Sequence, residues 1–278
     1  LPYAWFEGKC IPFKDAKIPI EDRGFRFSDS VYEVVKIINT KMLDFDFHMR
    51  RLKYSTSELN FNYKVNSILL KKIFQNLIKK NKLSNGIIYL QITRGVQSRE
   101  HAYKKNLNPS VVIYTAKKKF NLPNKNYKGF KAITYPDIRW GRPDIKTTSL
   151  LANIIAATEA SKKGAYETIL VKGKKITEAA HSNVWIVKGN KIITHPANKE
   201  ILKGVTRTVL INIIHSLGLK LTEKEFSLNE LYKSDEVFIT SSGSLVTPIT
   251  QIDNIKINNK KIGKITKALA LSFYKSII

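Results

Sequence analysis

The chain has 278 residues, 43% of them hydrophobic and 25% charged, and carries a formal net charge of +26 at pH 7. This length and hydrophobic content suit a globular protein of one large or two smaller domains. No apolar run reaches the roughly 20 residues of a membrane-spanning helix, and the N-terminus lacks a basic-then-apolar leader, so we expect no membrane partner. Cys10 is the only cysteine, which excludes an internal disulfide and fits a cytoplasmic location.

The positive charge is spread along the chain and is not gathered on one element. Lysine runs occur at 71–72, 79–80, 117–119 and 260–261. Nucleic-acid binders tend to cluster Arg and Lys on one element, with aromatic or small residues between them. We therefore expect no nucleic-acid partner, and a basic nucleic-acid-binding protein stays a remote alternative.

The first part of the chain predicts both strands and helices. A hairpin is expected over 4–9, and a glycine-containing loop leads into a strand within 22–39. Two helices are expected over 48–59 and 66–81, and two strands over 87–93 and 111–115. The apolar face expected for the second helix consists of Ile68, Leu69, Ile73, Leu77 and Ile78.

The second part follows a polar segment that contains Pro and Gly but has no periodicity. We expect an N-terminal domain at 1–118, a linker at 119–129 and a C-terminal domain at 130–278. A helix is expected over 147–163, capped by Thr147 or Thr148, and a final helix over 263–274. Strands are expected over 167–171, 183–187, 191–194 and 236–240. Because helices and strands mix without strict βαβ alternation, the fold class is expected to be α+β.

The segment ILKGVTR at 201–207 opens another helix. Gly218 is expected to provide its left-handed C-terminal cap. The buried face is expected to contain Val205, Val209, Leu210, Ile213, Ile214 and Leu217. The free amides and the positive dipole end at Gly204, Val205 and Thr206 form a candidate phosphate site.

Two further segments add a lysine and a carboxylate. Lys146 follows Asp-Ile just before a predicted helix, and Glu178 lies in TEAAHSNVW between two β-rich runs. Each alone is commonly a solvated side chain. Together with a phosphate cradle, they are the groups that pyridoxal 5′-phosphate needs.

The order and spacing of these segments resemble the fold-type IV pyridoxal-phosphate aminotransferases, most closely the D-amino acid aminotransferase branch. The resemblance runs from about Tyr3 to the last helix. It implies two α+β domains with the cofactor between them, and a homodimer. Amino acids and 2-oxo acids are the substrates that it implies.

The resemblance also implies roles at the cofactor. Lys146 would form the Schiff base and move protons, while Glu178 would keep the pyridine nitrogen protonated. Arg51, in a His-x-x-Arg-Leu pattern, would bind the phosphate, and the register of Leu52 favours it over Arg50. Leu202 would pack against the ring, and further phosphate contacts would come from Val205, Thr206, Ser242, Gly243 and Ser244.

The substrate side carries an Arg-x-His pair at Arg99 and His101. In the D-amino acid branch this pair and a tyrosine, matched here by Tyr32, hold the substrate α-carboxylate and so select the enantiomer. Val34 and Lys36 match residues near the side-chain pocket. The branched-chain aminotransferases and aminodeoxychorismate lyases of the same fold lack the pair, so the resemblance implies a D-amino acid aminotransferase.

Three departures from the family pattern affect these expectations. Phe27-Ser28-Asp29-Ser30 replaces Phe-Gly-Asp-Gly, and a serine reaches positive φ only at a cost, so Tyr32 could shift. Gly243 stands where the branch has a threonine. Ala180 and His181 stand where it has serines. A branched-chain L-amino acid aminotransferase or an aminodeoxychorismate lyase stays the alternative, the preferred amino donor is open, and no metal ligand is expected.

Overall fold

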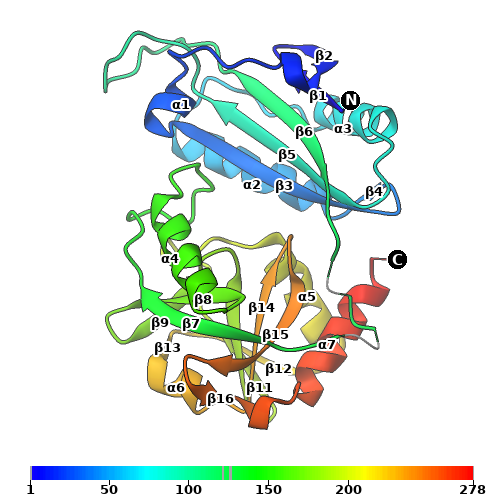
Figure 1. Cartoon of the computed structure of the whole chain (residues 1–278), viewed down its shortest axis with the longest axis vertical. Coiled ribbons are helices and arrows are strands. Elements are labelled where there is room, and N and C mark those ends of the chain that lie inside the picture. The colour runs from blue at the N-terminus through cyan, green and yellow to red at the C-terminus, as the bar shows by residue number, and fades with distance from the viewer. Residues whose placement is uncertain (1, 121, 125–126, 278) are drawn as a thin grey trace. The chain divides into compact units, whose positions relative to one another are not determined.

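The computed structural model describes residues 2–120, 122–124 and 127–277, and the chain divides into two units (Figure 1). The first unit is Leu1–Lys119 with Ile145–Ser149, and the second is Phe120–Asp144 with Leu150–Ile278. The domain boundaries expected from the sequence stay a prediction, and residues 121 and 125–126 of the expected linker lie outside the described residues. Both units combine helices with sheets, which confirms the α+β class. Within the described ranges, no helix is both long and apolar enough to cross a membrane.

The first unit contains a six-stranded antiparallel sheet in the order β2-β1-β6-β5-β3-β4. Its strands are β1 (Tyr3–Phe6), β2 (Lys9–Pro12), β3 (Ser30–Ile38), β4 (Lys41–Met42), β5 (Gly86–Thr93) and β6 (Val111–Lys117). Its helices are α1 (Arg23–Phe27), α2 (Phe45–Glu58) and α3 (Ser67–Lys80), with a short 3-10 turn η1 (Phe13–Asp15). Figure 1 shows α2 and α3 along one face of this sheet.

Strand β3 shows how the sheet separates its two faces. Val31, Val35 and Ile37 belong to the apolar core shared with α2 and α3. Because successive side chains of a strand point to opposite faces, Tyr32, Val34 and Lys36 share the other face. Three residues expected near the substrate therefore lie on one side of one strand.

Helix α3 corrects the expected apolar face. Its buried residues are Leu70, Ile73, Phe74, Leu77 and Ile78. Ile68 and Leu69 are 73% and 49% exposed, so their prediction as buried was wrong. The helix begins at Ser67, with the Asn66 side chain accepting from the Leu69 amide, and its packed row begins only at Leu70.

The second unit contains a ten-stranded sheet in the order β12-β11-β10-β14-β15-β7-β8-β9-β13, with β16 also paired to β15. Its strands are β7 (Phe130–Pro136), β8 (Glu167–Lys172), β9 (Lys175–Ala179), β10 (Asn183–Lys188), β11 (Lys191–Thr194), β12 (Lys220–Glu223), β13 (Phe226–Ser227), β14 (Glu236–Ser241), β15 (Leu245–Ile252) and β16 (Ile255–Lys256). Its helices are α4 (Leu151–Lys162), α5 (Val205–Ser216), α6 (Leu228–Tyr232) and α7 (Lys264–Lys275), with the 3-10 turn η2 (Asn258–Lys260).

Alternating side chains of these strands fill two cores. On β10, Trp185 and Val187 pack with residues of α5 and α7, whereas Val184 and Ile186 pack in a cluster that includes Leu231 of α6. Strand β10 is therefore apolar on both sides, which is why its sequence is a nearly continuous apolar run. The sheet thus provides a rigid base for the start of α5.

Helix α5 confirms part of its expected pattern. Val205, Leu210 and Ile214 are buried, and Gly218 has a φ of +66°, as expected for a left-handed cap. Leu217, expected on the buried face, is 46% exposed because the helix ends at Ser216 and Leu217 is its C-cap.

Helix α4 begins later than expected. Its N-cap is Leu150, so a cap at Thr147 or Thr148 was wrong. Thr147 instead forms a bridge with Val31, and the Thr148 amide donates to the Ser30 carbonyl. The residues before α4 are therefore extended beside β3.

Candidate cofactor and substrate site

Backbone hydrogen bonds hold Lys146 beside the first residues of β3. Its carbonyl accepts from the Tyr32 amide at 3.0 Å, and its amide donates to Ser55 Oγ of α2 at 3.2 Å. Its Nζ lies 4.0 Å from the centroid of the Tyr32 ring. Within the described part of the chain, Nζ has no hydrogen-bond or ion-pair partner. The structure therefore brings together two predicted site residues, and it presents a primary amine on an aromatic face.

That face continues across the sheet. Tyr32 stacks on Tyr89 at 5.6 Å between centroids, and Tyr89 lies 5.0 Å from Tyr114. Burial raises the pKa of the Tyr89 phenol. Lys36, two positions beyond the half-buried Val34, is only 3% exposed. Burial lowers the pKa of Lys36 to about 7, although Asp44 opposes this shift.

Arg51, the expected phosphate ligand, forms a bidentate ion pair with Glu33 of β3. Its Nε and one terminal nitrogen each lie 2.8 Å from a Glu33 oxygen, and His48 Nδ1 lies 2.7 Å from the same carboxylate. Burial alone would raise the pKa of Glu33, but Arg51 and then His48 hold it well below its usual range. A phosphate role for Arg51 stays a prediction.

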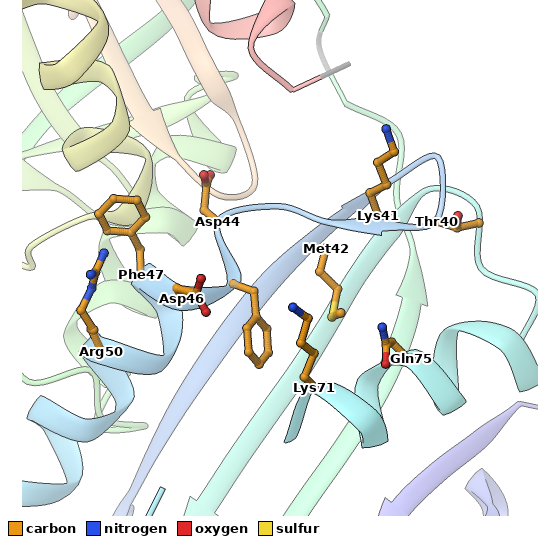
Figure 2. Close-up of a pocket in the computed structure, with 10 residues that line it drawn as sticks. Thr40, Lys41, Met42, Asp44, Asp46, Phe47, Arg50, Lys71 and Gln75 are labelled. Carbon is orange, nitrogen blue, oxygen red and sulfur yellow. The ribbon is translucent and has the colours of Figure 1, made fainter. Parts of the chain in front are cut away.

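Arg50 points elsewhere, as Figure 2 shows. Its guanidinium lies 4.4 Å from the centroid of the Phe47 ring and lines a pocket of about 640 Å³. The other residues of this pocket are Thr40, Lys41, Met42, Asp44, Phe45, Asp46, Phe47, Lys71 and Gln75. None of them was expected in the site. Of these two neighbouring arginines, Arg51 pairs with Glu33 of β3, whereas the choice of Arg51 over Arg50 as phosphate ligand stays a prediction.

Arg99 and His101 lie on an exposed loop beside α1. The Arg99 guanidinium is 5.8 Å from the centroid of the Phe27 ring, and the His101 ring is 5.6 Å from it. Within the described part of the chain, neither forms a hydrogen bond or ring contact with Tyr32. The structure does not bring these three predicted carboxylate ligands together, and their shared role stays a prediction.

The loop itself is firmly anchored. The buried Arg23 donates to the carbonyls of Glu100 and His101 at 2.7 and 3.0 Å, and it pairs with Asp29. Arg94 pairs with the same aspartate. The backbone that carries the Arg-x-His pair is therefore tied to a buried ionic network.

Ser28 shows what the loss of a family glycine means. It caps α1 with φ 54° and ψ 24°, in the left-handed region where a side chain is strained. Ser30, the second replacement, is not in this region, and Gln91 donates to its Oγ at 3.1 Å. Of the two serines that replace glycines, only Ser28 therefore has a strained backbone conformation.

In the second unit, Glu178 lies on β9 and is 5% exposed. Its Oε1 accepts from the Leu202 amide at 3.0 Å and from Arg139, and its Oε2 accepts from Asn183 Nδ2 at 3.0 Å. Burial raises the pKa of Glu178, and Arg139 and the Leu202 amide act against this rise. The carboxylate is fixed in one orientation by three donors.

Sequence reasoning missed Arg139 and Asn183. Arg139 is held by Asp137, whose two oxygens accept from it at 2.9 and 2.7 Å. Asn183 donates to Glu178 and also to the Leu202 carbonyl at 2.9 Å. The available signal was a polar residue opening the apolar strand NVWIV, and an Asp-x-Arg pair ahead of the lysine.

Gly204 is the N-cap of α5, with a φ of −63° that any residue adopts. A Cβ built there would lie 2.1 Å from Asn183 Oδ1, so the glycine makes room for the amide that orients Glu178. No side chain caps this helix, which leaves the first-turn amides of Val205 and Thr206 without a side-chain acceptor. Both residues are buried.

The turn 241–244 joins β14 to β15. Asn183 pairs with Thr240 across β10 and β14, so this turn lies at the same end of the sheet as the Asn183 amide. Ser241 Oγ accepts from the amides of Gly243 and Ser244 at 3.2 and 3.1 Å and lies 2.7 Å from Ser244 Oγ. Ser242 lies within the same turn, and Ser241 was not among the residues expected to contact the phosphate.

His181 is a third departure whose setting is now defined. Its ring is 63% exposed, and Nδ1 lies 3.4 Å from Glu167 Oε1. Asn153 donates to the carbonyl of the neighbouring Ala180 at 2.8 Å. The Ala180 backbone is therefore held by a side chain of α4.

The donor set fits a phosphorylated pyridine. A buried carboxylate with oriented oxygens suits a protonated ring nitrogen, uncapped helix amides suit a phosphate, and a lysine without an ion-pair partner suits a carbonyl carbon. This combination, on an α+β fold, is typical of the pyridoxal-phosphate enzymes.

The chain belongs to the class IV aminotransferase family, whose model matches residues 30–252. It is 37% identical to the D-alanine aminotransferase of Listeria monocytogenes serotype 1/2a, over 95% of this chain and 92% of that protein. It is also 37% identical to the D-alanine aminotransferase of Bacillus licheniformis, over 98% and 96% of the two chains. The branched-chain amino acid aminotransferase of Thermobaculum terrenum, solved in its PLP form, has the same fold with a TM-score of 0.87, 22% identity and coverage of 99% and 93%.

Proposed function

We propose that the protein is a D-amino acid aminotransferase that uses pyridoxal 5′-phosphate. It moves an amino group from a D-amino acid to a 2-oxo acid, for example from D-alanine to 2-oxoglutarate, giving pyruvate and D-glutamate. The observation that carries this proposal is the 37% identity to D-alanine aminotransferases over nearly the full chain. The branched-chain neighbour, at 22% identity, supports the fold alone.

The cofactor, when bound, supplies an electrophilic carbonyl and a ring that accepts an electron pair. In the second unit, the Glu178 carboxylate would keep the ring nitrogen protonated, while Arg139 and Asn183 hold that carboxylate in place. The amides of Val205 and Thr206 and the turn of Ser242, Gly243 and Ser244 hold the phosphate, and Leu202 packs on the ring.

In the first unit, Lys146 Nζ is the amine that holds the cofactor and moves the Cα proton. The Tyr32 ring beneath it keeps water from one side of Nζ. Arg51 contributes a cation to the phosphate. Although Arg99 and His101 form no contact with Tyr32 within the described residues, we keep these three as the proposed ligands of the substrate carboxylate that present one enantiomer. Val34 and Lys36 would lie beside the substrate side chain.

We further propose that the protein is a cytoplasmic homodimer, and that its small-molecule substrates are its other partners. The single cysteine is consistent with a reducing compartment. No nucleic acid takes part, because the lysines are dispersed over nearly every segment of the chain. Sedimentation of the holoprotein at two salt concentrations, with and without duplex DNA, tests the dimer and the absence of nucleic-acid binding.

The test of the activity is a product assay on the cofactor-loaded protein. D-alanine and 2-oxoglutarate should yield pyruvate, whereas L-leucine with the same acceptor should yield little 4-methyl-2-oxopentanoate. A faster reaction with L-leucine would replace the proposal with the branched-chain alternative. Release of pyruvate from aminodeoxychorismate, without any 2-oxo acid acceptor, would favour the lyase.

A further inference from the structure

A histidine and two glutamates meet in the second unit, apart from the side chains assigned to the cofactor. His195 follows β11, Glu200 lies in the loop that leads to α5, and Glu225 lies between β12 and β13. One ligand atom from each lies within 4.8 Å of the other two. A nitrogen with two carboxylate oxygens is a donor set that suits a divalent transition metal such as Zn²⁺.

The orientation of His195 is the strongest feature of this cluster. The side chain is 98% buried, and Nδ1 lies 2.9 Å from the Pro196 carbonyl. A carbonyl only accepts, so Nδ1 donates to it, and Nε2 is the ring nitrogen that faces the carboxylates. A backbone carbonyl on the second nitrogen is the arrangement that orients histidine ligands in metal sites.

The distance between His195 Nε2 and the Glu200 carboxylate is longer than a hydrogen bond but matches the separation of two ligands on one metal ion. Nε2 lies 3.6 Å from Glu200 Oε2, and within the described residues it forms no hydrogen bond. Bonds of 2.0–2.2 Å to a tetrahedral Zn²⁺ place two ligand atoms about 3.4 Å apart. The exposed Glu225 carboxylate needs to move by only about 1 Å to complete the set.

Each glutamate forms an ion pair with a lysine. A bound metal ion leaves the pair of Glu200 with Lys172 in place and displaces Lys175 from Glu225. Lys172 lies 3.0 Å from Glu200 Oε1, which leaves Oε2 directed at His195. Lys175 pairs with Glu225 Oε2 at the surface, where an ion pair contributes little. Among the residues that the structure describes, the second Glu225 oxygen forms no hydrogen bond or ion pair.

The backbone of the loop is already arranged for binding. The Glu200 amide donates to Asn198 Oδ1 at 2.9 Å, and the Asn198 amide donates to the Pro196 carbonyl at 2.8 Å. The Glu200 carbonyl accepts from Arg139 at 3.3 Å. A metal here would therefore fix the loop whose next residues carry Leu202 and Gly204.

We propose that His195 Nε2, Glu200 and Glu225 form a structural site for a divalent transition metal ion of the Zn²⁺ class, completed by water. The sequence predicted no metal ligand because the three residues are separated by unremarkable spacings and meet only through the pairing of β11 with β12. The ion stabilises the second unit and takes no part in the transfer of the amino group.

The test uses the tag-free, cofactor-loaded full chain after treatment with a chelator. Zn²⁺ is added, unbound ion is removed by gel filtration, and bound zinc is measured by elemental mass spectrometry, with Mg²⁺ as the comparison ion. We expect one Zn²⁺ per chain, a rise in Tm on binding, and no retention of Mg²⁺. Glu225→Gln should bind Zn²⁺ at least tenfold more weakly, and His195→Gln should show the same loss.

Glu159→Gln is the matched control, since Glu159 is a partly exposed glutamate of α4 that is likewise paired with a lysine. It should bind Zn²⁺ as the wild type does. If the wild type retains no zinc, or if Glu225→Gln binds as tightly as Glu159→Gln, the site does not exist and His195 is simply part of a salt-bridge cluster. Because zinc content is measured without any amino acid substrate, either result leaves the aminotransferase proposal untouched.

Discussion

Replacement of Gly204 by alanine should damage the support of Glu178 through steric contact alone. The added Cβ would lie 2.1 Å from Asn183 Oδ1, so the amide must move by about 1 Å to reach ordinary contact distance. Such a shift breaks the hydrogen bonds from Asn183 Nδ2 to Glu178 and to the Leu202 carbonyl. Losing one bond to a charged acceptor and one to a neutral acceptor costs about 2–4 kcal/mol.

The assay is urea denaturation of the apoprotein together with cofactor titration. Gly204→Ala should lower the free energy of unfolding by about 2–4 kcal/mol and weaken cofactor binding at least tenfold. Gly141→Ala is the control, because a Cβ at Gly141 meets nothing within 4 Å and its φ is not positive. It should leave both quantities near wild type.

A double-mutant cycle with Asn183→Ala isolates the contact. Once the amide is removed, the Cβ at position 204 has room, so Gly204→Ala should cost little in that background. A full cost in the Asn183→Ala background would refute the steric explanation. So would a Gly204→Ala protein as stable as the wild type.

Four further predictions follow from individual side chains. Lys146→Ala should abolish transamination while Tm stays within a few degrees of wild type; retained turnover would exclude the lysine from its role. Arg99→Ala should raise KM for D-alanine by one to two powers of ten, about 1.5–3 kcal/mol, whereas Arg50→Ala, another arginine over a phenylalanine ring, should not; equal effects would remove the carboxylate role. Ser28→Gly should stabilise the protein by about 1 kcal/mol in urea denaturation because it relieves a positive φ, and a destabilised variant would contradict this strain. Burial lowers the pKa of Lys36 to about 7 in the folded protein, so between pH 7 and 10 the unfolded chain binds one more proton at Lys36 than the folded protein does. The free energy of unfolding of the wild type should therefore rise over this pH range more than that of Lys36→Met. Parallel pH profiles for the two proteins would refute the lowered pKa.

Much of the site was predictable where the chemistry is local in the chain. Glu178 and Lys146 stand in short segments with recognisable order, and the helix at Gly204 is visible from its period and its Gly218 cap. Periodicity and capping suffice to find the helix. The roles of Lys146 and Glu178 follow only from the resemblance to the family, because each alone is commonly a solvated side chain.

The supports of the site were not predictable because they arise from distant segments. Arg139 reaches Glu178 across 39 positions of the chain, and Asn183 acts through Gly204 and Leu202 in a separate loop. The residues before α4 look helical in isolation. They are extended because Thr147 pairs with Val31, 116 positions earlier, and that pairing overrides local propensity.

The prediction of the buried face of α3 was wrong for a related reason. Its first turn offers Ile68 and Leu69 as apolar residues, and a helical pattern accommodates either starting point. Packing against the sheet of the first unit selects the row that begins at Leu70. Period alone does not reveal which row faces the core.

The most direct test of the central claim is a single-turnover comparison of the two alanine enantiomers. The cofactor-loaded protein is mixed with D-alanine or L-alanine without any acceptor, and the absorbance change of the bound cofactor is followed. The D-enantiomer should convert the cofactor at least a hundredfold faster, with one pyruvate released per active site. Equal rates, or a faster reaction with L-alanine, would contradict the assignment of a D-amino acid aminotransferase.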